Sequence, residues 1–101
     1  MFGLIAKLTA VPGERDRLIE AIAESIGAMP GCISYVMAKD ATDESVVWVT
    51  EIWVDQASHD ASLQLPAVLA SIAAARPLVA HFEKVAATTP VRGVPGPYPA
   101  R

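Results

Sequence analysis

Val46-Val47-Trp48-Val49-Thr50-Glu51-Ile52-Trp53-Val54 is the stretch of sequence that decides the fold. Every residue in it except Glu51 is β-branched or aromatic, a composition that favours a strand, and we expect a strand over 45–54. Apolar side chains occupy both alternating sets of positions, so both faces of this strand should be covered. In an α+β domain with a single sheet, helices cover one face, and something else must cover the other.

The flanking sequence predicts the remaining elements. We expect strands over 2–10, 32–39 and 80–89, an amphipathic helix over 14–29, a short helix over 56–63 and a helix from Pro66 to Pro77. Pro30-Gly31 should close the first helix, and Asp55 should be the N-cap of the second. The residues that we expect to be buried on the third helix are Val68, Leu69, Ile72 and Ala75.

The resulting order, β-α-β-β-α-β with the second helical segment broken in two, predicts a ferredoxin-like α+β fold over 1–89. This fold is an antiparallel sheet with helices on one face. The open face, rich in Val and Trp, would be buried by a second copy placed sheet to sheet, so we expect a homodimer. The tail over 90–101 is rich in Pro and Gly, which predicts no regular element but an extended segment or an arm on a partner.

Composition supports the same reading. The chain has 101 residues, which is one domain, and 52% of them are hydrophobic. A monomer of this size cannot easily bury so many apolar side chains. Some of them should therefore lie in a subunit interface or line a ligand cavity.

Charge and cysteine content exclude several classes of protein. The net charge of -3, without a basic cluster, argues against nucleic acid as a partner. No apolar run approaches the length of a membrane span, and the N-terminal residues read as a strand rather than a signal peptide. Cys32 is the single cysteine and cannot form an internal disulfide, so we expect the cytoplasm.

Several motifs in this order resemble those of the antibiotic biosynthesis monooxygenase family. They are Pro30-Gly31-Cys32 with Ser34-Tyr35, then Trp48-Val49-Thr50-Glu51-Ile52-Trp53, the helix opening Asp55-Gln56-Ala57, and Ala73-Ala74-Ala75-Arg76-Pro77-Leu78-Val79. The resemblance spans about residues 2–89. It implies a dimeric α/β barrel and, in the characterised enzymes, a monooxygenase that oxidises quinol- or anthrone-type aromatic compounds with molecular oxygen. It also implies that neither metal nor flavin is used.

The sequence departs from the family in two places. Many relatives have a histidine at the position of Ser62, whereas here the nearby histidine is His59, about one turn earlier and on roughly the same side of the helix. A haem-degrading branch of relatives uses an Asn-His-Trp set, and this chain contains no asparagine. Haem degradation is therefore disfavoured.

The candidate site residues on the strands are Glu51, Trp53, Tyr35 and Trp48. A carboxylate in an apolar strand is costly to bury, so Glu51 is either functional or lies at a sheet edge or in an ion pair. Trp53 shares a strand face with Glu51 and is either core or pocket lining, and Tyr35 has the same two alternatives. Trp48 has the opposite parity, so the two tryptophans should not face one cavity unless a bulge intervenes.

His59 is the best candidate for acid–base work because histidine titrates near neutrality, although an exposed position on a surface helix is the alternative. For His81 we expect surface or interface placement, and for Cys32 an inert thiol. Two histidines 22 positions apart and one cysteine give no metal-ligand spacing, and no phosphate-binding glycine motif is present. We expect no metal and no cofactor.

The leading hypothesis is a cofactor-independent monooxygenase acting on a small aromatic substrate. In it, His59 and Glu51 are the catalytic residues: His59 assists proton transfer, and Glu51 shapes or polarises the pocket together with Tyr35 and Trp53. Tyr35, Trp53, Trp48 and Ser62 are the residues expected to contact the substrate. The rival hypothesis is a non-catalytic dimeric module of the same fold that binds a hydrophobic ligand or none. A polar group converging on an enclosed apolar cavity would favour the enzyme.

Overall fold

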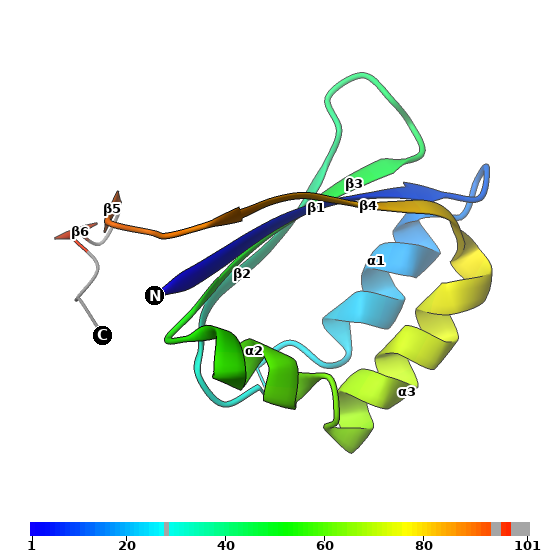
Figure 1. The fold of residues 1–101 in the computed structure, drawn as a ribbon. Coiled ribbons are helices and arrows are strands. Elements are labelled where there is room, and N and C mark those ends of the chain that lie inside the picture. Colours follow the sequence, from blue (N-terminus) through cyan, green and yellow to red (C-terminus); the bar gives the residue numbers. More distant parts are fainter. Residues whose placement is uncertain (28, 94–95, 98–101) are drawn as a thin grey trace.

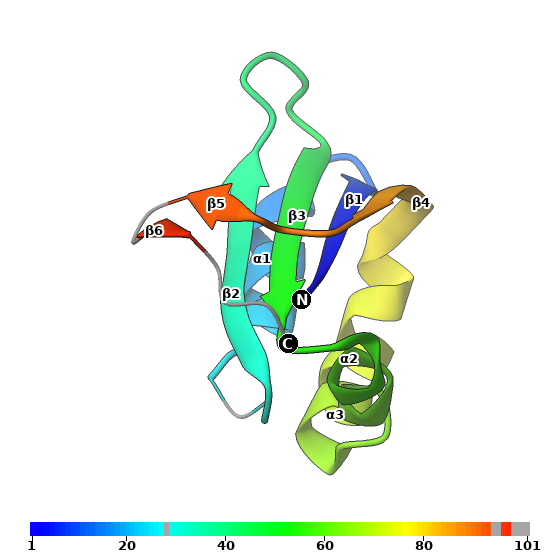
Figure 2. The same cartoon turned by 60° about the vertical axis from the view of Figure 1, so that its left-hand side comes forward.

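The computed structural model describes residues 1–27, 29–93 and 96–97. Its elements in chain order are β1 (Phe2–Ala10), α1 (Arg15–Ala23), β2 (Cys32–Lys39), β3 (Val46–Trp53), α2 (Gln56–Ser62), α3 (Pro66–Ala75), the 3-10 turn η1 (Arg76–Leu78), β4 (Val79–Thr88), β5 (Arg92–Gly93) and β6 (Gly96–Pro97). The first four strands form an antiparallel sheet in the order β2-β3-β1-β4. All three α-helices lie on one side of this sheet (Figures 1 and 2). The predicted ferredoxin-like α+β fold is confirmed.

The strand register divides the side chains of the sheet into two faces. Across β1, β3 and β2, one row on the helix-covered face is Leu4, Glu51 and Tyr35. A neighbouring row on the opposite face, which we call the open face, is Ile5, Thr50 and Val36. Strand alternation therefore places Glu51 toward the helices, on a strand that is paired along both edges.

The core lies between the sheet and the helices. Its fully buried members include Leu18 of α1 and Val47 of β3, and it continues through Leu8, Val49 and Ala75. The β-branched and small residues of the strands supply one side of this layer, and the amphipathic stripe of α1 supplies the other. The part of the same layer that lies toward α2 and α3 contains the candidate site.

The first helix is shorter than the sequence predicts. The pattern over 14–29 was expected to continue to Met29, but α1 ends at Ala23 and turns follow through Gly27. The Ser25 hydroxyl donates to the carbonyl of Ile22 (3.2 Å), and Gly27 has a φ of 95°, which a helix does not accommodate. Local polar competition and a left-handed glycine therefore override the apolar spacing.

The buried face of α3 also differs from the prediction. The buried residues are Val68, Ser71 and Ala75, whereas Leu69 is 47% exposed and Ile72 is 36% exposed. The predicted stripe was wrong for these two residues because nearly every position of this helix is apolar or small, so the sequence pattern does not fix which face packs.

The C-terminal tail contains a regular element that composition did not predict. Arg92–Gly93 pairs with Gly96–Pro97 as a two-residue antiparallel ladder beyond the end of β4 and away from the main sheet (Figures 1 and 2). Residues 94–95 and 98–101 lie outside the described residues. That this tail packs on a partner stays a prediction.

Within the described ranges, no single helix is long and apolar enough to span a membrane. By length and composition alone, α2 together with the segment Pro66–Leu78 meets the requirement, but the two are bent by 69° at the break between them.

Candidate active site

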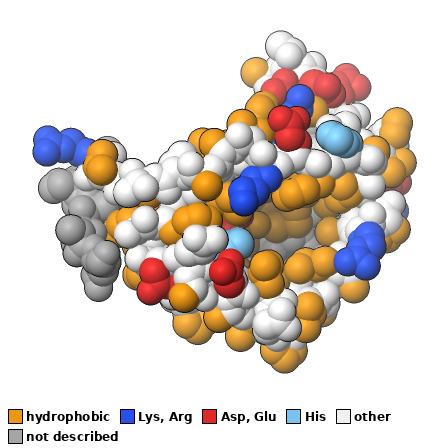
Figure 3. Space-filling view, in the orientation of Figure 1, with side chains coloured by type: hydrophobic (Ala, Val, Ile, Leu, Met, Phe, Trp, Pro, Cys, Tyr) orange, Lys and Arg blue, Asp and Glu red, His pale blue; other side chains and the backbone are white. Residues whose placement is uncertain are grey.

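A pocket of about 710 Å³ lies between the helix-covered face of the sheet and the helices, a volume in the usual range for small-molecule sites. Figure 3 shows the hollow, with hydrophobic side chains over its inner surface and Lys or Arg side chains near its rim. Most of its wall is apolar or aromatic: Phe2, Leu4, Ala6, Leu8, Ile22, Met29, Tyr35, Val49, Trp53, Leu63, Val68, Ile72, Ala75, Val79 and Phe82. Its polar members are Ser25, Glu51, Gln56, His59, Asp60, Ser62, Ser71, Arg76 and Lys84.

Glu51 and Trp53 form the buried polar centre of this pocket. Because they are two residues apart on β3, they share the helix-covered face, and the Trp53 Nε1–H donates to Glu51 Oε1 at 2.9 Å. Glu51 is 8% exposed and Trp53 is 1% exposed. Burial raises the pKa of the Glu51 carboxyl, while the indole hydrogen bond and nearby His59 oppose that rise. The alternative position for Glu51 at a sheet edge is wrong, because β3 is an inner strand.

His59 is brought to the pocket by the start of α2. Asp55 is the N-cap, as predicted, and its carboxylate accepts from the Ser58 N–H at 2.7 Å. Gly31, with a φ of 84°, lies against this turn, and a Cβ atom there would be 2.6 Å from the Ser58 Cβ. The close approach of Gly31 sets the position of the first turn of α2, which carries the imidazole.

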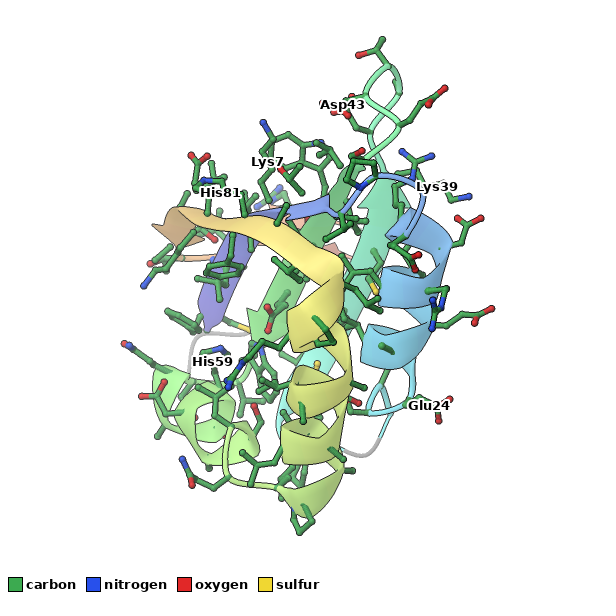
Figure 4. The ribbon with its side chains drawn as sticks, turned by 90° about the vertical axis from the view of Figure 1, so that its right-hand side faces the viewer. Lys7, Glu24, Lys39, Asp43, His59 and His81 are labelled. Carbon is green, nitrogen blue, oxygen red and sulfur yellow. The ribbon has the colours of Figure 1, made fainter. Side chains whose placement is uncertain are left out.

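The His59 side chain is 17% exposed and lies between an acidic surface residue and Glu51. Its Nδ1 is 3.1 Å from Asp60 Oδ1, and its Nε2 is 4.0 Å from Glu51 Oε1. The ring packs edge-on against Trp53 and tilted against Phe2, with ring centroids 5.5 Å apart in both cases. In Figure 4, His59 lies between α2 and the sheet, while Lys7 and His81 project from the opposite side of the sheet. The exposed surface position considered for His59 is therefore not what the structure has.

Tyr35 and Cys32 of β2 border the same carboxylate. Tyr35 pairs with Glu51 across the strands and lines the pocket. Burial raises the pKa of the Tyr35 phenol, and the charge of Glu51 adds to the rise, so Tyr35 is a neutral hydrogen-bond donor at physiological pH. The pKa of the Cys32 thiol is also raised, first by burial and then by Glu51, which agrees with an unreactive thiol.

The other two predicted residues differ in placement. Ser62 lines the pocket, but its hydroxyl donates to the backbone carbonyl of His59 at 2.6 Å. Trp48 does not line the pocket: it lies on the open face, where its Nε1–H donates to Asp40 Oδ1 at 2.8 Å and Lys7 lies over its ring. The two tryptophans thus occupy opposite faces, as strand parity predicts, and the hypothesis that Trp48 contacts the same ligand is wrong.

Among the pocket residues that sequence reasoning missed are Phe2, Ser71, Arg76 and Lys84. The parity of the first strand could have identified Phe2, which pairs with Trp53. No sequence signal indicates the other three. Within the described part of the chain, no group of three or more His, Cys, Asp or Glu side chains is arranged to hold a metal ion.

The fold and the site define a class of protein: a small α+β ferredoxin-like domain with an apolar pocket that encloses a hydrogen-bonded carboxylate. A family model described as antibiotic biosynthesis monooxygenase matches residues 1–74, and the chain belongs to this family. The resemblance seen in the sequence motifs is confirmed.

Solved structures agree with this membership. A protein from Chloroflexus aurantiacus, provisionally described as an antibiotic biosynthesis monooxygenase, is 48% identical with a TM-score of 0.87, and the match covers 91% of this chain and 94% of that one. A protein from Deinococcus radiodurans with the same provisional description is 22% identical (TM-score 0.75, covering 88% and 91%). One from Nitrosomonas europaea is 14% identical (TM-score 0.79, covering 88% and 97%), and these two show the fold alone. No curated protein matches the chain.

Proposed function

We propose that this protein is a cofactor-independent monooxygenase that oxidises a small quinol- or anthrone-type aromatic compound with molecular oxygen. The observation that carries the proposal is the Glu51 carboxylate, buried in the wall of an apolar pocket and held by the Trp53 indole. A filled cavity or one without such a group would instead fit the rival hypothesis of a binding module. Family membership supports a monooxygenase role.

In this proposal Glu51 is the general base. Its raised pKa brings it nearer to the proton affinity of a phenolic substrate than an exposed carboxylate would be, which favours proton transfer at neutral pH. The neutral Tyr35 hydroxyl and the indole N–H donate hydrogen bonds that stabilise negative charge in the site. The proton accepted by Glu51 leaves through His59, whose Nε2 faces Glu51 and whose Nδ1 faces the exposed Asp60.

The reaction balances without another reductant. Deprotonation gives an electron-rich phenolate, which transfers one electron to O2, and the resulting substrate radical and superoxide combine at a ring carbon. At an anthrone methylene the new hydroperoxide loses water and leaves a carbonyl group. One oxygen atom of O2 thus enters the product, the other becomes water, and the electrons come from the two C–H bonds of the substrate.

The test is oxygen-dependent turnover. The purified protein is incubated with a panel of quinols and anthrones under ¹⁸O2, with and without a chelator, and product formation is compared with autoxidation. We expect at least one compound to be converted faster than autoxidation, with one ¹⁸O atom in the product and no effect of the chelator. Rates equal to autoxidation across the panel would favour the binding module.

We further propose that the protein is a homodimer that buries the open face, in the cytoplasm. Across β2 and β3 this face carries Val36, Trp48 and Ile52, and Val36 is 54% exposed in the single chain. Lys7 of β1 and Glu83 of β4 place charges toward the other side of the same face, where Ile5 of β1 is the apolar neighbour of Thr50. Sedimentation equilibrium should give twice the chain mass of 10.7 kDa, and a mass of one chain would contradict the proposal.

A further inference from the structure

The pocket contains a buried hydroxyl without a protein partner. Ser71 of α3 is 6% exposed and lines the pocket, and its Oγ has no hydrogen-bond partner in the part of the chain that the structure describes. Buried hydroxyls are normally satisfied, and a serine inside a helix commonly donates to a carbonyl of the preceding turn. A hydroxyl that lines a cavity and lacks that bond is available to a ligand.

Two cationic side chains line the same pocket. Arg76 begins η1 at the end of α3, and Lys84 of β4 pairs with Ala6, a residue of the helix-covered face. A bulge in β4 between the partners of Ile5 and Ala6 adjoins Lys84, and bulges re-aim neighbouring side chains. Both residues are exposed, which agrees with the Lys or Arg side chains near the rim in Figure 3. Among the described residues, neither takes part in an ion pair.

The charges of the pocket are therefore separated by structural element. The carboxylate and imidazole come from β3 and α2, whereas the two cations and the unsatisfied hydroxyl come from β4, η1 and α3. Lys84 lies two strands across the sheet from Glu51, with β1 between them. A ligand that satisfies both sets of side chains at once therefore needs two chemically different groups.

We propose that the substrate is an aromatic carboxylate whose anionic group is bound by Arg76, Lys84 and the Ser71 hydroxyl. An arginine can pair with both oxygens of a carboxylate, and the lysine and serine supply further donors. The apolar wall between the two ends accommodates the rings. The assignment of the other end to Glu51 rests on the function proposed above, but the binding of the carboxylate does not.

The test measures binding without turnover. Anthracene-2-carboxylate and anthracene-2-carboxamide share one ring system and differ in charge, and their dissociation constants can be measured by quenching of tryptophan fluorescence. For the wild-type protein we expect the carboxylate to bind about tenfold more tightly than the amide, as for one charge-assisted hydrogen bond. Lys84→Met and Arg76→Met should each remove most of this preference, and Ser71→Ala should weaken carboxylate binding about threefold.

Lys39→Met is the matched control, because Lys39 pairs with Asp16 at 2.9 Å outside the pocket, and it should retain the full preference. Equal binding of acid and amide by the wild-type protein, or no binding of either, would overturn the proposal. An equal loss of preference in Lys39→Met and Lys84→Met would also overturn it. The two proposals fail separately: a carboxylate preference without oxidation of any quinol would refute only the monooxygenase, and oxidation without that preference would refute only the carboxylate site.

Discussion

The two tryptophans of β3 each donate an indole hydrogen bond to a carboxylate, yet the two carboxyl groups respond in opposite directions. Trp53 donates to Glu51 at 2.9 Å inside the pocket, and Trp48 donates to Asp40 at 2.8 Å on the other face. The pKa of Glu51 is raised, whereas that of Asp40 is held below its ordinary value.

The difference comes from solvent and from the number of donors. Asp40 is partly exposed to water and also accepts bonds from the backbone N–H groups of Thr42 and Asp43, so its ionised form is favoured. Glu51 is buried with one indole donor and a histidine 4.0 Å away, and desolvation outweighs both. The same donor on the same strand therefore anchors the 40–45 loop on one face and holds a buried carboxyl group with a raised pKa on the other.

The largest expected effect is on activity, when each of the two carboxylates is replaced by its amide. Glu51→Gln should reduce kcat/KM for the best quinol by about 100-fold or more, because it removes the general base while keeping a group that accepts from Trp53. Asp40→Asn, the matched change at the other tryptophan, should leave kcat/KM within about twofold. Steady-state kinetics of both variants measure the contrast, and an equal loss in both would remove the assignment of Glu51 as base.

A smaller effect should follow from the histidine. His59→Ala should lower kcat by about tenfold, because the proton accepted by Glu51 loses its path to solvent. It also removes an interaction that lowers the pKa of Glu51, so the acid limb of the pH–rate profile should move to higher pH. His81→Ala, an exposed change on β4, is the control. An unchanged acid limb in His59→Ala would contradict the coupling between the two groups.

The smallest effect is on stability, and it should have opposite signs at the two sites. Asp40 has a lower pKa in the folded state than in the unfolded state. Its contribution to the free energy of unfolding is therefore fully present above the unfolded-state pKa and is lost as the pH falls toward the folded-state pKa. Asp40→Asn should therefore reduce stability at neutral pH and flatten the loss in acid. Glu51 has a higher pKa in the folded state than in the unfolded state. Its ionisation therefore lowers the free energy of unfolding as the pH rises from the unfolded-state pKa through the folded-state pKa, and Glu51→Gln should remove this decrease. Urea unfolding from pH 3 to 8 measures both slopes, and slopes of the same sign would contradict the comparison.

The accuracy with which the sequence predicts the face occupied by a side chain depends on how regular its strand or helix is. The two-residue period of β3 assigned Glu51 and Trp53 to one face and Trp48 to the other, because an extended strand leaves no freedom in that assignment. The pattern of α3 was a weaker guide, since its residues are almost all apolar: the predicted buried set was right for Val68 and Ala75 and did not include Ser71.

The cationic side of the pocket could not be predicted for a related reason. The face occupied by Lys84 depends on the β4 bulge, which shifts the strand period by one residue and has no signature in the sequence. Arg76 belongs to the motif over 73–79, but its place in the pocket wall depends on how η1 packs below the sheet. Tertiary packing, rather than local propensity, decides both positions.

The position of β3 inside the sheet also bears on how such proteins diversify. Glu51 is fixed by backbone pairing with β1 on one side and β2 on the other, while much of the rest of the wall belongs to α2, α3 and β4. Mutations in those outer elements can remodel the cavity without moving the acid. Descendants of this fold can therefore change the shape of the pocket gradually while the buried carboxylate stays in place.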